Sequence, residues 1–417
     1  MSAKSNQFQS KQYHAAIGVI ERLRANGHTA YLAGGCVRDL LLGVEPNDFD
    51  VATDAKPTEI EGYFRKTASV GAAFGVMLVH DFGETIEVAT FRSDGSYTDA
   101  RRPDSVEFST PKEDAQRRDF TINALFYNPF AEDEDQQIID FVDGRADIKA
   151  MVLRAVGNPA DRLKEDHLRA LRAVRFAARY GLEIDQTTSD AIREDASELS
   201  GVSVERIGEE VRRMMSHPSR VLAVELLRQH GLDKTIFGTS GYNDQLRTLR
   251  ALDSKADAMT AIAAWRHDHE GQWKLEKLNS SGSSRGWEWS LDLSRAQSEH
   301  FRHVLEFAQA FIEDWDTMTV AARKRLGARK HAGEALLLAE AIKPIGWESP
   351  RGNLTQLAQE PGGLSPHPLV TGADLIELGI KPSPVFKDIL DAVYDEQLEG
   401  RVQTQPQAIE FVKNKVN

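Results

Sequence analysis

Several features of secreted and membrane proteins are missing from this sequence. Its 417 residues include a single cysteine, Cys36, so the chain cannot form an internal disulfide. No apolar run approaches the roughly 20 residues that a membrane-spanning helix needs. The N-terminal stretch 1–12 is polar and has no hydrophobic segment typical of a signal peptide. We therefore expect a cytoplasmic protein without structural disulfides.

An excess of basic residues is also missing. The chain has 51 Lys and Arg against 64 Asp and Glu, which gives a net charge of −13 at pH 7. Such a charge disfavours broad, non-specific binding to nucleic acid. If the protein binds RNA, the contacts must come from a local basic cluster. The arginine-dense stretch 162–179 is a candidate.

A glycine pair lies between an apolar strand and a helix near the N-terminus. The strand is predicted over 29–33, the pair is Gly34 and Gly35, and the helix is predicted over 36–42. Glycines at such a turn let the backbone approach a phosphate, and the helix start offers N–H groups and a positive dipole end. Arg38 on the first turn can add a charge-assisted contact to a phosphate oxygen. The pattern indicates a phosphate-binding turn.

Two carboxylates follow this turn. Asp48 and Asp50 are two residues apart on a predicted second strand, so both side chains point to one face. A lone pair of this kind is usually a solvated strand edge. Beside a phosphate-binding turn, however, two carboxylates can bind the divalent metal ions of a phosphoryl-transfer site. We therefore interpret Asp48 and Asp50 as catalytic metal ligands.

The segment 34–50 resembles the nucleotidyltransferase signature of class II tRNA nucleotidyltransferases (CCA-adding enzymes) and bacterial poly(A) polymerases. The residues that carry the resemblance are Gly-Gly-Cys-Val-Arg-Asp at 34–39 and Asp-Phe-Asp at 48–50. The resemblance implies a polymerase-β-like head in which Asp48 and Asp50 bind two Mg²⁺ ions.

Glu87 is a candidate third carboxylate. It lies in the second strand of a hairpin predicted around 81–84, within a segment, 86–91, that is similar to the family at that place. The resemblance implies a third catalytic carboxylate on a strand next to the metal ligands. A charged residue on the solvent face of the sheet is an equally good interpretation.

The polar stretch 92–108 resembles the flexible loop of the family, with Asp99 and the Arg-Arg-Pro run at 101–103 as its recognisable residues. The resemblance implies that this loop helps to switch nucleotide choice between successive additions. A loop of ordinary length argues against an enzyme that adds only CC, in which the loop is usually shortened.

The run Arg-Arg-Asp-Phe-Thr-Ile-Asn-Ala at 117–124 matches the family at every position. We expect a helix here, with Arg118 able to bind phosphate and Asp119 able to accept a hydrogen bond from a ribose hydroxyl. An exposed ion-pair patch would explain Arg-Arg-Asp alone, but not the whole run.

A long helix is predicted over 160–180, in which Asp166 and Arg169 share a face at i, i+3 spacing. A simple salt bridge is the commoner meaning of that spacing. The segment also matches the family motif Glu-Asp-x-x-Arg, which implies that Asp166 and Arg169 choose the incoming base without a template. Arg172 and Arg175 continue the same face and are further candidates for nucleotide binding.

The chain is long enough for about two to four domains. We predict an α+β protein, in which a polymerase-β-like nucleotidyltransferase head with a mixed or antiparallel sheet is followed by an all-α neck, body and tail. The predicted segments are a head at 1–156, a base-reading neck at 157–220, a body at 221–360 and a tail at 361–417.

These features predict a template-independent tRNA nucleotidyltransferase that adds CMP, CMP and AMP from CTP and ATP to the tRNA 3′ end with Mg²⁺. A poly(A) polymerase usually has a longer insert before the 117–124 run and a basic C-terminal tail, and neither is seen. An enzyme that adds only A would look much the same. An RNA-binding protein with an inactive head is disfavoured because Asp48 and Asp50 are present.

Overall fold

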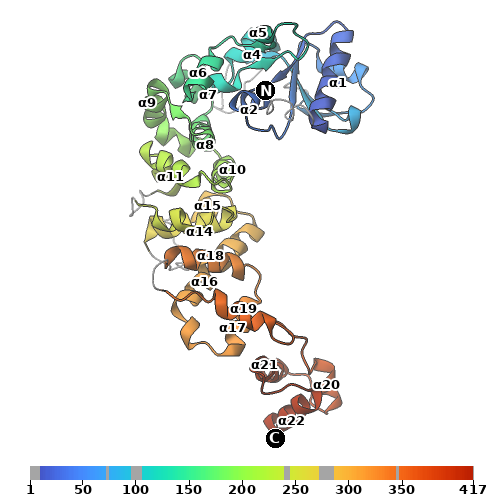
Figure 1. Cartoon of the computed structure of the whole chain (residues 1–417), viewed down its shortest axis with the longest axis vertical. Coiled ribbons are helices and arrows are strands. Elements are labelled where there is room, and N and C mark those ends of the chain that lie inside the picture. Colours follow the sequence, from blue (N-terminus) through green and yellow to red (C-terminus); the bar gives the residue numbers. More distant parts are fainter. Residues whose placement is uncertain are drawn as a thin grey trace. The chain divides into compact units, whose positions relative to one another are not determined.

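A computed structural model describes residues 10–71, 75–94, 106–238, 245–271, 286–343 and 347–416 (Figure 1). The chain divides into two compact units. The N-terminal unit comprises Met1–Glu210 and Leu222–Ile236, and the C-terminal unit comprises Val211–Val221 and Phe237–Asn417. The finer division into head, neck, body and tail stays a prediction.

A mixed sheet forms the centre of the N-terminal unit. Its strand order is β3-β4-β5-β2-β1-β8-β9, and among the described pairings β2 and β5 are parallel while the others are antiparallel. The strands are β1 (Ala30–Ala33), β2 (Asp50–Thr53), β3 (Thr67–Gly71), β4 (Val76–Val79), β5 (Ile86–Thr90), β8 (Phe126–Tyr127) and β9 (Ile138–Ile139).

Amphipathic elements cover this sheet. Helix α1 (Lys11–Ala25) packs on β1, β2 and β5 through its buried face, which includes Val19, Ile20 and Leu23. A second apolar cluster contains Phe91 and Phe126, whose rings meet edge to face with centroids 5.6 Å apart. Burial of aromatic side chains of this size contributes strongly to stability.

Shorter elements complete the N-terminal unit. Two small sheets pair β6 (Arg92–Asp94) with β7 (Val106–Phe108), and β10 (Val152–Leu153) with β11 (Glu183–Ile184). The helices and 3₁₀ turns up to residue 237, of which α10, α11 and α12 have residues in both units, are α2 (Gly35–Leu42), α3 (Pro57–Tyr63), η2 (Asp81–Gly83), α4 (Pro111–Gln116), η3 (Thr121–Asn123), α5 (Glu134–Gln137), α6 (Gly144–Ala150), α7 (Pro159–Glu165), α8 (Arg169–Tyr180), α9 (Gln186–Asp195), η4 (Ala196–Gly201), α10 (Val204–Met215), α11 (Arg220–Gln229) and α12 (Leu232–Phe237).

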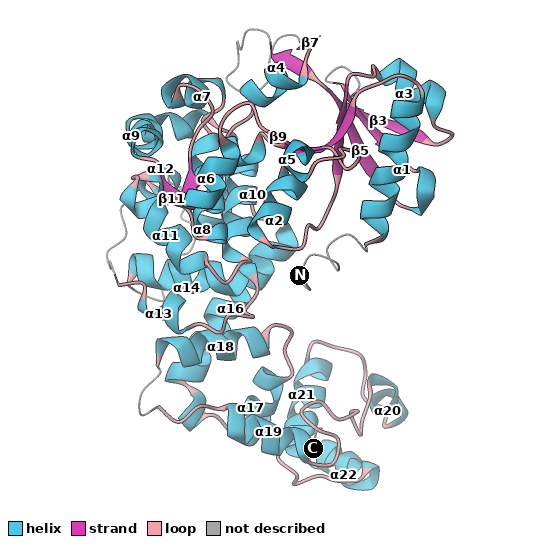
Figure 2. Ribbon diagram, turned by 45° about the horizontal axis from the view of Figure 1, so that its top comes forward, coloured by secondary structure: helices cyan, strands magenta, loops and turns pink. Residues whose placement is uncertain are grey.

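The C-terminal unit is helical throughout its described residues, as the cyan ribbons of Figure 2 show. None of the described helices is long and apolar enough to cross a lipid bilayer. The elements are α13 (Arg247–Ala251), α14 (Ala258–Glu270), α15 (Trp287–Ser290), α16 (Arg295–Glu313), η5 (Trp315–Thr317), α17 (Val320–Gly327), α18 (Ala332–Ile342), α19 (Arg351–Gln359), α20 (Gly372–Glu377), α21 (Val385–Leu398) and α22 (Gln405–Val416). The prediction of an α+β head followed by helices is confirmed.

Candidate active site

The turn between β1 and α2 has the conformation that the glycine pair predicts. Gly34 is the N-cap of α2 and has φ 70°, a value that other residues rarely adopt. A Cβ at Gly34 would lie 2.7 Å from Nη1 of Arg118, whereas a Cβ at Gly35 would meet nothing closer than 3.6 Å. Gly34 is therefore required both for the turn and for the close approach of Arg118.

The three candidate carboxylates lie on adjacent segments. Asp50 begins β2, but Asp48 precedes the strand, so the expectation that both lie within it is wrong. Phe49 between them is buried against Tyr13, which leaves Asp48 exposed and Asp50 partly exposed. The parallel register pairs Val51 with Val88, so Asp50 and Glu87, one residue earlier on each strand, are neighbours.

The charges of these carboxylates repel one another. Burial, Glu87 and Asp48 together raise the pKa of Asp50 from 3.8 to about 7, although Arg118 acts in the opposite direction. Burial and the charge of Asp48 also raise the pKa of Glu87. A divalent cation would offset this repulsion, and carboxylate oxygens are the ligands that Mg²⁺ prefers. The donor set therefore fits the divalent metal that the resemblance implies.

Arg118 lies between the glycine turn and the carboxylates. It donates hydrogen bonds to Asp114 Oδ2 from Nε at 3.1 Å and from Nη2 at 3.0 Å, and Nη1 donates to the carbonyl of Asn123 at 3.0 Å. Asp114 is buried. Although burial raises the pKa of Asp114, the charges of Arg118 and Arg117 hold it below its usual value. The Arg118 guanidinium is thus fixed beside Gly34, where a phosphate would approach.

Arg38 is buried rather than directed into open space. It donates to Asp39 from Nε and Nη2 at 2.9 and 2.7 Å, to Asn123 Oδ1 at 2.6 Å and to the Tyr180 hydroxyl at 2.7 Å. The guanidinium also lies over the Phe176 ring, 5.0 Å from its centroid. This placement favours a role in holding α2 against η3 and α8 over the direct phosphate contact expected from the sequence.

The run 117–124 is not a helix, so that expectation is wrong. It consists of a turn after α4, a β-bridge from Phe120 to Ala155, and η3. The irregular backbone lets Asn123 act as a junction: its side-chain oxygen accepts from Arg38, its carbonyl accepts from Arg118, and Nδ2 donates to Asp119 at 3.1 Å.

Asp119 is partly buried, and both of its carboxylate oxygens accept hydrogen bonds. Arg172 donates to Asp119 Oδ2 from Nε at 2.8 Å and from Nη2 at 2.6 Å, while the backbone N–H of Phe120 donates to Oδ1 at 2.8 Å. Burial alone would raise the pKa of Asp119, but the charge of Arg172 and the hydrogen bonds from Asn123 and Arg172 lower it to about 2. Asp119 therefore has the geometry of a group that orients Arg172.

The helix predicted over 160–180 is broken at Asp166. Helix α7 ends at Glu165, Asp166 is extended with φ −158°, and α8 begins at Arg169. Oδ1 of Asp166 accepts from the backbone N–H of Leu168 at 3.1 Å, a local bond that competes with helix continuation. Asp166 and Arg169 thus do not share a helix face.

Asp166 and Arg169 also do not form a salt bridge with each other, although a salt bridge is the commoner explanation for an Asp and an Arg at i, i+3 spacing. Arg206 donates to Asp166 Oδ2 at 2.7 Å, and Arg169 donates to Glu165 Oε2 at 2.6 Å. Further along α8, Arg175 donates to the buried Glu210 at 2.6 Å. Each of these charged groups is held by a partner outside the Asp166–Arg169 pair.

Several residues of the site were not singled out from the sequence. They are Asp114, Asn123, Tyr180 and Glu210. Only Asn123 gave a signal, because it lies inside the matched run 117–124. The others contribute through contacts between residues distant in the chain, such as the 2.8 Å hydrogen bond from Tyr180 to Asp39. The stretch 95–105, with Asp99 and the Arg-Arg-Pro run, lies outside the described residues.

Two family models match the N-terminal half of the chain. The poly(A) polymerase head domain matches residues 30–154, and a probable RNA- and SrmB-binding site of polymerase A matches residues 181–238. The first match contains the glycine turn and all three carboxylates. Fold and site together define a nucleotidyltransferase with a polymerase-β-like head.

The similarity to curated proteins extends over almost the whole chain. The CCA-adding enzyme of Geobacillus stearothermophilus is 31% identical over 412 residues, which cover 95% of each chain. That of Lactobacillus delbrueckii is 34% identical over 94% of this chain and 96% of its own. The crystal structure of the Bacillus stearothermophilus CCA-adding enzyme in complex with CTP matches with a TM-score of 0.80 and 29% identity, covering 99% of this chain and 98% of that one. The chain therefore belongs to the CCA-adding enzyme family, whose nucleotidyltransferases use a divalent metal.

Proposed function

We propose that this nucleotidyltransferase adds the CCA end to tRNA without a nucleic-acid template, using CTP and ATP. The relatives with full-length similarity are named CCA-adding enzymes. The observation that carries the proposal is the set of coupled carboxylates, Asp48, Asp50 and Glu87, beside the turn at Gly34. This arrangement supports phosphoryl transfer and has no evident purpose in a protein that only binds RNA.

In the proposed reaction the 3′-hydroxyl oxygen of the tRNA attacks the α-phosphorus of the nucleotide. A bond forms between these two atoms, the bond from the α-phosphorus to the bridging oxygen breaks, pyrophosphate leaves, and the hydroxyl proton is released. Asp48 and Asp50 would hold two Mg²⁺ ions, and Glu87 would complete the carboxylate set. When bound, the ions supply charge neutralisation for the attacking and leaving oxygens.

The triphosphate would be held at the turn between β1 and α2. Gly34 and Gly35 permit close approach of the backbone, and Arg118 supplies a positive charge that Asp114 keeps in place. We assign Arg38 a positioning role, because its donors are already used by Asp39, Asn123 and Tyr180.

Base choice would lie with Asp166 and Arg169. Arg206 and Glu165 hold these side chains from outside, so a carboxylate and a guanidinium are kept in fixed orientations without neutralising each other. Together they offer the acceptors and donors needed to distinguish base edges. Asp119 would act by orienting Arg172. Arg172 and Arg175 on α8 would also contact the nucleotide.

The four-segment organisation of the chain and its location in the cytoplasm are part of the same proposal. The segments are the head at 1–156, the neck at 157–220, the body at 221–360 and the tail at 361–417. A cytoplasmic location would agree with the tRNA substrate.

The decisive experiment incubates the protein with Mg²⁺ and tRNAs that end before the CCA, after C or after CC, and supplies each nucleotide separately. CCA addition predicts incorporation of two C residues and then one A, with no further growth. Incorporation of A only onto tRNA ending in CC would replace the proposal with A addition, and arrest after CC would replace it with CC addition. Unlimited A addition would indicate a poly(A) polymerase, and no incorporation would leave an RNA-binding protein.

A further inference from the structure

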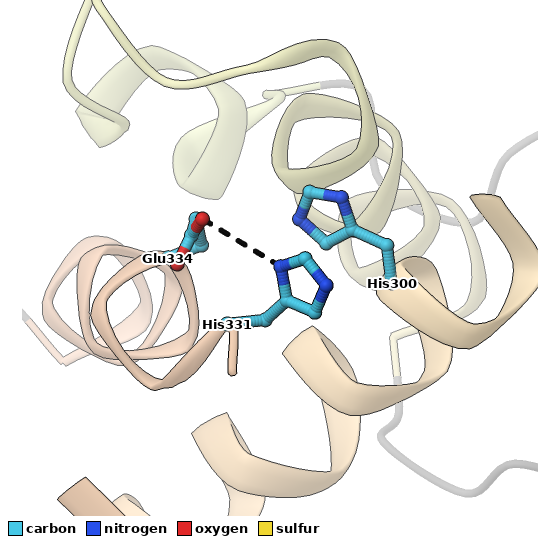
Figure 3. Close-up of side chains that lie close together, drawn as sticks. All are labelled: His300, His331 and Glu334. Atoms are coloured by element: carbon cyan, nitrogen blue, oxygen red, sulfur yellow. Dashed lines mark ion pairs between the residues drawn. The ribbon is translucent and has the colours of Figure 1, made fainter. Parts of the chain in front are cut away.

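The C-terminal unit contains two histidines and a carboxylate that the proposed reaction does not use. His300 lies on α16, His331 directly precedes α18, and Glu334 lies in the first turn of α18. One ligand atom from each residue lies within 4.8 Å of the other two, and no other group of this kind occurs in the described part of the chain. We call these three residues the histidine cluster. The two imidazole rings are stacked, with centroids 3.7 Å apart, and Figure 3 shows Glu334 facing His331.

One imidazole nitrogen of each histidine in the histidine cluster lacks a hydrogen-bond partner. Nε2 of His300 and Nδ1 of His331 are buried and have no hydrogen-bond partner, and Nδ1 of the neighbouring His303 is in the same condition. Buried polar atoms without partners are rare, and each is unfavourable for stability. Several such nitrogens in one place therefore indicate that the cluster accommodates a group that the protein itself does not supply.

One separation inside the histidine cluster and one next to it are close to those of ligands that share a metal ion. Nδ1 of His331 lies 3.6 Å from Oε1 of Glu334, and Nε2 of His300 lies 3.7 Å from Oδ1 of Asp257. Both distances are too long for a hydrogen bond. Two ligands bound at about 2.0–2.1 Å to one tetrahedral zinc ion are separated by about 3.3 Å. Small side-chain movements would bring these pairs to that spacing.

The ring orientation and the access route also bear on metal binding. The rings are nearly parallel, with an interplanar angle of 14°, so one ring must tilt for both nitrogens to face the same ion. The Glu334 side chain is 39% exposed, which gives an ion a path from solvent.

We propose that His300, His331 and Glu334 bind a zinc ion that ties α16 to α18. Two imidazoles and one carboxylate form a ligand set that suits Zn²⁺, whereas Mg²⁺ prefers oxygen ligands throughout. Asp257 or water takes the fourth position. Because α16 packs against α18, the ion strengthens an existing helix contact in the C-terminal unit. The proposed zinc site differs in its ligands from the carboxylates proposed to bind Mg²⁺, and it belongs to the C-terminal unit rather than to the N-terminal unit.

The test uses untagged, full-length protein treated with a chelator and then kept in excess Mg²⁺, which occupies the head carboxylates. Zn²⁺ binding is measured by calorimetry and elemental analysis, and Co²⁺ is used as an optical probe of tetrahedral coordination. The variants are H300Q and E334Q. The matched control is H367Q, an exposed histidine of the same unit. Melting temperatures in chelator establish that each variant is folded, and the exposed Glu334 makes E334Q the safer of the two.

We expect wild type and H367Q to bind one Zn²⁺, to show an intense visible Co²⁺ spectrum and to melt at a higher temperature with Zn²⁺. H300Q and E334Q should bind at least roughly 10-fold more weakly and lose the thermal shift. Absence of Zn²⁺ binding to wild type at micromolar concentrations would overturn the proposal. So would equal binding by E334Q and wild type, or binding that is lost in D50N and kept in E334Q.

Discussion

Asp50 and Asp119 carry the same chemical group in opposite electrostatic settings. Asp50 faces Glu87 and Asp48, and its pKa is raised to about 7. Asp119 is also partly buried, but Arg172 donates two hydrogen bonds to it and its pKa falls to about 2. Like-charge repulsion and burial outweigh the influence of Arg118 at Asp50, whereas the charge of Asp119 is balanced by the Arg172 that binds it.

This difference distinguishes carboxylates that need a bound cation from a carboxylate that is already paired with an arginine. A cluster of like charges such as Asp48, Asp50 and Glu87 is unfavourable for the fold and becomes favourable when a cation binds. A buried ion pair is already favourable in geometry and becomes costly when one partner is removed. Substitutions at Asp50 should therefore reduce activity and spare the fold, whereas substitutions at Asp119 should damage the fold first.

The largest expected effect is on turnover. Replacing Asp50 or Asp48 by Asn removes a metal-binding charge, so we expect nucleotide incorporation to fall by at least roughly 10³-fold. Because the substitution also relieves like-charge repulsion, the melting temperature in the absence of Mg²⁺ should stay the same or rise. Single-turnover incorporation and thermal unfolding measure the two effects. A large drop in the melting temperature would show that Asp50 is a structural residue.

The next effect is on stability. Asp119→Asn leaves the Arg172 guanidinium, whose side chain is 31% exposed, against a neutral partner and weakens two charge-assisted hydrogen bonds, so we expect a loss of about 1.5–3 kcal/mol in the free energy of unfolding. Denaturant unfolding measures it. The matched control is Asp190→Asn, which removes an ion pair to Arg193 whose side chains are 52% and 40% exposed. That change should lie within about 1 kcal/mol. Equal losses in both variants would contradict the contrast between buried and exposed pairs.

The pH dependence of the free energy of unfolding should show the effect of Asp50 in the wild-type protein. The pKa of Asp50 rises from 3.8 to about 7 on folding, so the folded chain binds more protons than the unfolded chain between these values. Stability from this group therefore falls as pH rises from about 4 to about 7, by about 2–4 kcal/mol. The difference between wild type and Asp50→Asn, measured in chelator, isolates this loss. Addition of Mg²⁺ at pH 7 should reverse it in wild type only.

A smaller effect is expected at the glycine turn. Gly34→Ala would force an alanine into a φ of 70° and place its Cβ 2.7 Å from Arg118 Nη1. We therefore expect the free energy of unfolding to fall by about 1–3 kcal/mol and the KM for the nucleotide to rise. Gly35→Ala is the control, because Gly35 lies in α2 and its Cβ would meet nothing closer than 3.6 Å. If both variants behave alike, the conformation of Gly34 is not the cause.

The sequence predicted the parts of the site that depend on short, local patterns. The glycine turn, the proximity of Asp50 to Asp48, and the strand that carries Glu87 follow from motifs a few residues long. The place of Asp48 before β2 was missed because Asp-x-Asp spacing cannot distinguish a strand from its approach. The α+β class was predictable because the strand-rich and helix-rich stretches are well separated in the chain.

The errors arose where side chains override backbone propensity. The stretch 160–180 has strong helical periodicity, but the Asp166 carboxylate binds the Leu168 N–H and interrupts the helix. The run 117–124 turns because Asn123 and Asp119 bond to Arg38 and Arg172, which are distant in the sequence. Partners such as Arg206 for Asp166 are tertiary contacts that no local pattern contains.

The smallest effect on stability should accompany a clear effect on specificity. Asp166 and Arg206 form a partly exposed pair, with side chains 16% and 21% exposed, so Asp166→Asn should change the free energy of unfolding by about 1 kcal/mol. If Asp166 reads the base, the same substitution should lower the preference for C and A over U and G by roughly 10-fold, because one hydrogen-bond acceptor becomes a donor. Competition assays with mixed nucleotides measure this ratio. Arg206→Lys keeps the charge but loosens the geometry, so it should lower selectivity by less. Unchanged selectivity in Asp166→Asn would reduce Asp166 to an element of the break between α7 and α8.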